Sequence, residues 1–111
     1  MPADVQIWGG ATIPTRFMPL SASWPLAGLS ADYKGVAVSL GSRKSTWHVS
    51  WAELDHVLVG PRSVVLVPVQ GRACRFNVRS RQRLAPLLAM FDSQHIPSER
   101  VRSTIGWAFK I

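Results

Sequence analysis

The feature that most constrains the fold is a two-residue alternation of apolar with small or polar side chains over residues 36–40 and again over 46–51. Alternation of this period predicts strands with one buried face. Asp32-Tyr33-Lys34-Gly35 precedes the first run and has the composition of a tight turn, in which Gly35 supplies a positive φ. Residues 41–45 form the reversal between the two runs. The sequence therefore predicts an antiparallel hairpin.

Three further runs continue the pattern. Strands are predicted over 54–59, 64–69 and 73–79, separated by Gly60-Pro61-Arg62 and Gln70-Gly71-Arg72. A further strand is predicted over 26–31, before the Asp32–Gly35 turn. Pro68 lies inside the second of these strands and indicates an edge position or a bulge, because proline cannot donate a ladder hydrogen bond.

The hydrophobic period changes from two to 3.6 after Ser80. Leu84, Leu87, Leu88 and Phe91 fall on one face of a helix, and Ser80 is a suitable N-cap. The predicted fold is mostly β (α+β): a bent antiparallel sheet or partly open barrel of six or seven strands, closed by one C-terminal amphipathic helix. The expected core consists of inward-facing residues on these elements: Val38, Leu40, Trp47, Val49, Trp51, Phe76, Leu84, Leu88 and Phe91.

The predicted domain covers residues 20–98. Residues 1–19 hold three prolines and a Gly-Gly pair, so they are assigned to an N-terminal extension from which Val5–Trp8 is expected to dock on a sheet edge. Residues 99–111 form a C-terminal extension, whose odd-numbered apolar positions suit a terminal strand.

The order of these elements carries a family resemblance. It rests on Pro25-Leu26-Ala27, Asp32…Gly35-Val36, Val49-Ser50-Trp51-Ala52-Glu53-Leu54…Val57 and Leu84-Ala85…Leu87-Leu88…His95-Ile96-Pro97. On these residues the chain resembles the bacterial pleckstrin-homology-like (PH-like) domains of actinobacterial type. The resemblance implies a membrane-proximal or scaffolding role. The resemblance does not extend to the inositol-phosphate site of the family's phosphoinositide-binding members, because Lys34 is the only cation in the first hairpin turn and lies near Asp32.

Charge points to anionic partners. The chain has 13 Lys and Arg against 6 Asp and Glu, a net charge of +7. Such an excess favours nucleic acid, anionic lipid or an acidic protein, although it also serves solubility alone. In a meander, alternate turns lie at opposite ends of the sheet. This parity gathers six cations and no acid at one end, which is the candidate anion- or partner-binding site: Arg43, Lys44, Arg62, Arg79, Arg81 and Arg83.

Catalysis, metal and cofactor binding are not expected. His48, His56 and His95 lack metal-ligand spacing, and Cys74 faces the core with no adjacent base. A single cysteine suits a reducing cytoplasm, and the longest apolar runs are far shorter than the ~20 residues of a membrane-spanning helix.

The preferred hypothesis is a non-enzymatic binding or adaptor module. It recognises a protein partner through the Arg-rich end, with the anionic cytoplasmic membrane surface as a candidate location. One alternative is a small basic β-barrel that binds nucleic acid; another is a mobile-element effector that binds a host protein. Small or polar outward residues on the predicted strands disfavour base stacking. Trp8, Trp107 and Phe109 are candidate interface residues for self-association or insertion into a membrane surface.

Overall fold

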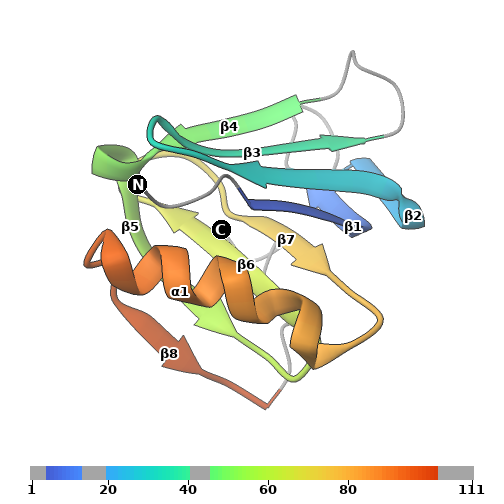
Figure 1. The fold of residues 1–111 in the computed structure, drawn as a ribbon. Helices are drawn as coiled ribbons and strands as arrows, with labels where there is room; N and C mark the ends of the chain where they lie inside the picture. The colour runs from blue at the N-terminus through green and yellow to red at the C-terminus, as the bar shows by residue number, and fades with distance from the viewer. Residues whose placement is uncertain (1–4, 14–19, 41–45, 103–111) are drawn as a thin grey trace.

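The computed structural model describes residues 5–13, 20–40 and 46–102. They form one mixed sheet of eight strands that does not close, with one α-helix (Figure 1). The sheet order is β4-β3-β2-β1-β7-β6-β5-β8. The strands are β1 (Val5–Ile13), β2 (Leu20–Ala31), β3 (Gly35–Leu40), β4 (Thr46–Ser50), β5 (Leu54–Val59), β6 (Ser63–Pro68), β7 (Cys74–Asn77) and β8 (Ser98–Arg100). Two 3-10 turns, η1 (Trp51–Glu53) and η2 (Arg81–Leu84), flank these strands, and the helix is α1 (Ala85–Ser93).

The prediction of a mostly β chain with one C-terminal helix is confirmed. The described residues contain eight strands instead of six or seven, because residues 5–13 in the predicted N-terminal extension and residues 98–100 at the start of the predicted C-terminal extension each form a strand. β8 is only three residues long and pairs with β5 in parallel, while the other pairs are antiparallel.

β1 occupies the middle of the sheet, between β2 and β7. The expectation that Val5–Trp8 docks on a sheet edge is therefore wrong. Val5, Ile7, Ala11 and Ile13 are all buried, so this segment has the apolar face that a central strand needs. A register shift between Gly9 and Ala11 interrupts its ladder with β2. At Gly9 a Cβ would overlap the Asn77 carbonyl, so glycine permits the close approach of β7.

The turn between β2 and β3 has the predicted chemistry. One carboxylate oxygen of Asp32 accepts hydrogen bonds from the backbone N–H groups of Lys34 (2.8 Å) and Gly35 (3.3 Å). Gly35 has φ of +153°, and a Cβ there would overlap the Val49 carbonyl of β4. The turn thus requires glycine for both its backbone conformation and the close neighbouring strand.

The second half of the sheet contains β5, β6 and β7. Pro68 lies at the end of β6 opposite Leu54, where the register shifts between Leu54 and His56. The predicted association of Pro68 with a bulge is therefore confirmed.

The helix begins as expected from its cap. The Ser80 hydroxyl accepts a hydrogen bond from the Gln82 N–H at 3.3 Å, and η2 leads directly into α1. Leu84, Leu87 and Phe91 are buried in the core beneath the sheet. Of the expected core residues, Val38, Leu40, Val49 and Phe76 are also buried, whereas Trp47, Trp51 and Leu88 are only partly buried and pack against its margin.

Candidate binding surfaces

The predicted Arg-rich end is assembled by the pairing of β6 with β7. Ser63 pairs with Asn77, and the Val78 N–H donates a 2.8 Å hydrogen bond to the Arg62 carbonyl. The turn that carries Arg62 therefore lies beside the segment that carries Arg79, Arg81 and Arg83. All four side chains are exposed. We call these four residues the Arg-rich surface.

The remaining two cations of the prediction, Arg43 and Lys44, lie outside the described residues. Turn parity places these two residues with the other four only if each strand pairs with the next one along the chain. β4 and β5 are not adjacent in the sheet, so parity cannot be carried across η1. The grouping of Arg62 with residues 79–83 depends only on the β6–β7 ladder.

The Arg-rich surface is strongly positive. Residues 60–63 and 78–84 contain four arginines and no acidic residue. Each guanidinium presents a planar set of donors that matches carboxylate and phosphate oxygens. Arg75, on β7, is half-buried, and desolvation lowers its pKa. Its partial burial within β7 sets it apart from the four exposed arginines.

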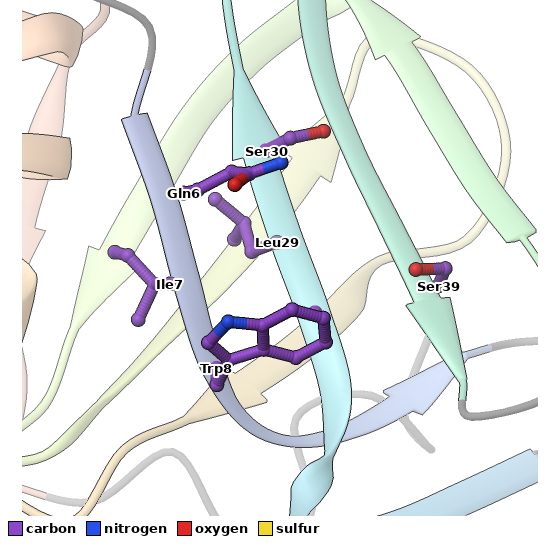
Figure 2. Close-up of a pocket in the computed structure, with 7 residues that line it drawn as sticks. Gln6, Ile7, Trp8, Leu29, Ser30 and Ser39 are labelled. Carbon is purple, nitrogen blue, oxygen red and sulfur yellow. The ribbon is translucent and has the colours of Figure 1, made fainter.

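A second surface surrounds Trp8 on the outer side of β1 and β2. Trp8 pairs directly with Gly28 and remains 60% exposed. Its indole borders a shallow pocket of about 80 Å³ (Figure 2). Gln6, Ser30 and Ser39 provide an amide and two hydroxyls around this pocket, and none of the described residues that line it is charged. We call this surface the Trp8 shelf.

The sequence indicates Trp8 as a candidate interface residue on a segment docked at a sheet edge, whereas the structure places it on the central strand β1. The local signal for such a strand is the alternation of Val5 and Ile7, which face inward, with Gln6 and Trp8, which face outward. Trp107 and Phe109 lie outside the described residues.

Two further hollows contain charged groups. A cavity of about 160 Å³ lies between α1 and β8, lined by apolar residues together with Asp92 and Arg100. Another, of about 100 Å³, lies beside β4 and includes Trp47, Glu53 and Arg72. Each carries both an acidic and a basic side chain, so neither adds to the positive surface.

Glu53 has a structural role in η1. Its carboxylate accepts hydrogen bonds from the Ser50 hydroxyl (2.8 Å) and the Ser50 backbone N–H (3.1 Å). These two bonds, the hydroxyl first, lower the pKa of Glu53. Burial raises the pKa of the Cys74 thiol well above its ordinary range, so the thiolate is disfavoured.

Within the described ranges, no three His, Cys, Asp or Glu side chains come together as metal ligands would. No helix in this part of the chain has the length and apolar character needed to cross a membrane. Neither a scan against protein-family models nor a search of curated proteins found a match to the sequence.

Proposed function

We propose that this protein is a non-enzymatic binding module. It docks on an acidic protein partner through the Arg-rich surface, at or near the anionic cytoplasmic face of a membrane. The observation that carries the proposal is the hydrogen-bonded junction of the β5–β6 turn with residues 78–83, which brings together two segments that carry four exposed arginines and have no acidic residue of their own.

The expected energetics suit a peripheral interaction. Each Lys or Arg close to an anionic membrane contributes about 1 kcal/mol, so a few arginines give a reversible, salt-sensitive attraction.

The proposed PH-like family is supported by seven antiparallel strands followed by a helix packed on the sheet. A binding role in that family requires neither a cofactor nor a catalytic group.

Charge reversal tests the proposal. The variant Arg62→Glu/Arg81→Glu/Arg83→Glu is compared with Lys34→Glu/Ala52→Glu/Gln70→Glu/Arg72→Glu, which changes the net charge equally at exposed positions near the opposite end of the sheet. Co-sedimentation uses phosphatidylcholine vesicles with and without about 30% phosphatidylserine, at about 50 and about 500 mM NaCl. Cross-linking capture from native cells with the same two variants provides the assay for a protein partner.

We expect the first variant to lose about 100-fold or more in affinity for anionic vesicles, since three cations at about 1 kcal/mol each correspond to that factor. We also expect it to lose its cross-linked partner. The second variant should retain most of both. Equal losses in the two variants would show that net charge alone is responsible and would refute a defined site.

One observation favours a nucleic-acid-binding role as the second candidate function. Base stacking is disfavoured where outward positions on the strands lack aromatic residues. Trp8 does occupy an outward position on β1, next to Gly28 of β2. Oligonucleotide binding that depends on Trp8, described below, tests this second candidate.

A further inference from the structure

The Trp8 shelf is shaped by the absence of a side chain on the opposing strand. Trp8 and Gly28 are directly paired, and a Cβ at Gly28 would lie 3.1 Å from Cζ3 and 3.4 Å from Cε3 of the indole. Figure 2 shows the ring extending from β1 across β2, and these distances place it over Gly28. An aromatic ring that covers a cross-strand glycine is a known way to stabilise a sheet. That role does not require the amide and hydroxyls that surround this ring.

The rim of the shelf suits a flat ring with polar edges. Figure 2 shows Gln6 on the same strand as Trp8, Ser30 on β2, and Ser39 on β3. Together they offer hydrogen-bond donors and acceptors without charge. Such groups can bind the edge of a nucleobase while the indole stacks on its face.

The shelf adjoins the Arg-rich surface through the β1–β7 ladder. Gly10, two residues after Trp8, pairs with Asn77, and Arg79 follows two residues after Asn77. Because the two strands are antiparallel, the chain beyond Asn77 continues toward the level of Trp8 before it turns into η2. An uncharged stacking surface thus lies next to a positive one.

We infer that the Trp8 shelf is a stacking platform for a base of single-stranded nucleic acid, whose phosphates lie on the adjoining Arg-rich surface. The inference rests on that surface binding anions, as in the proposed function. Single strands fit because their base faces are open to an indole, whereas duplex bases are already stacked on each other. A neutral sugar would use the shelf but gain nothing from the arginines.

The experiment separates stacking from charge. Fluorescence anisotropy measures binding to labelled oligo-dT and oligo-U of about twelve nucleotides, and to an abasic strand with the same number of phosphates. The full chain is compared with Trp8→Ala, Trp8→Phe and Tyr33→Ala. Tyr33 is an exposed aromatic residue (79%) on the β2–β3 turn and serves as the matched control. Thermal unfolding checks that each variant is folded.

We expect the full chain to bind the base-bearing strands more tightly than the abasic strand. One stacked base contributes about 1 kcal/mol or more, so Trp8→Ala should bind oligo-dT or oligo-U more weakly by a factor of about five or more. Its affinity for the abasic strand should not change. Trp8→Phe should fall between Trp8→Ala and the full chain, and Tyr33→Ala should match the full chain. The oligo-dT and oligo-U arms show whether DNA or RNA is preferred.

Equal binding of base-bearing and abasic strands, or unchanged binding by Trp8→Ala, would overturn the stacking inference while leaving the Arg-rich surface intact. A Trp8-dependent affinity for a neutral oligosaccharide in the absence of oligonucleotide binding would also overturn it. A different result would show that the Arg-rich surface does not bind phosphates. In that case Arg62→Glu/Arg81→Glu/Arg83→Glu would bind the base-bearing and the abasic strands as tightly as the full chain does.

Discussion

Trp51 connects three parts of the fold, which makes it the most informative position for a stability test. Its indole N–H donates a 2.7 Å hydrogen bond to the Asp32 carbonyl in the β2–β3 turn. Its ring meets Phe91 of α1 edge to face, with a centroid distance of 6.1 Å and an interplanar angle of 77°. Because β4 and β5 do not pair, these contacts hold η1 in place between the two halves of the sheet.

Two substitutions separate the contributions. Trp51→Phe keeps an aromatic ring but removes the hydrogen bond, so the free energy of unfolding should fall by about 1 kcal/mol. For a chain of this length, that loss corresponds to a fall in Tm of about 4 °C. Trp51→Leu also removes the aromatic pair and part of the packing. Its total cost should be about 2 to 3 kcal/mol.

Urea unfolding followed by far-UV circular dichroism measures these losses without relying on tryptophan fluorescence. Trp8→Phe is the control, because Trp8 is 60% exposed and its replacement should change the free energy of unfolding by less than about 0.5 kcal/mol. A double-mutant cycle of Trp51→Leu with Phe91→Leu should show coupling of at least about 0.5 kcal/mol. Equal effects of Trp51→Phe and Trp8→Phe, or no coupling to Phe91, would refute this account of the corner.

Two further predictions concern the same end of the sheet. Gly35→Ala should lower the free energy of unfolding by more than about 2 kcal/mol, because it combines an unfavourable φ with overlap on the Val49 carbonyl. Gly71→Ala should lower it by only about 1 kcal/mol, because φ there is +97° but the nearest atom is 4.0 Å from the added Cβ. Thermal unfolding measures both losses. Similar losses would contradict the role given to the Val49 contact. Glu53 has a folded-state pKa below its ordinary value of 4.5, so its contribution to stability is present above that pH and is lost as the pH falls through the folded-state value. The Tm difference between the wild type and Glu53→Gln should therefore shrink between about pH 7 and about pH 3, and a constant difference would count against the Ser50–Glu53 hydrogen bonds.

Several elements could be predicted from the sequence because their signals are local. The Asp32–Gly35 turn, the alternating strands on either side of it and the Ser80 cap each depend on residues within a few positions of one another. The position of β1 could not be predicted in this way. Its central place depends on pairing with β7, which lies far along the chain at Cys74–Asn77, and its flanking prolines resemble those of a linker.

The two candidate surfaces likewise depend partly on local sequence and partly on contacts between distant segments. Composition and hydrophobic period are enough to indicate a strongly basic, mostly β chain with one C-terminal helix, because both can be counted along the amino-acid sequence. That β4 and β5 are not neighbours, that Arg62 lies beside the segment after β7, and that Trp8 faces outward over Gly28 follow only from the fold. Strand pairing joins distant segments through backbone hydrogen bonds that nearly any side chain permits, so the pairing is selected by burial of the whole core.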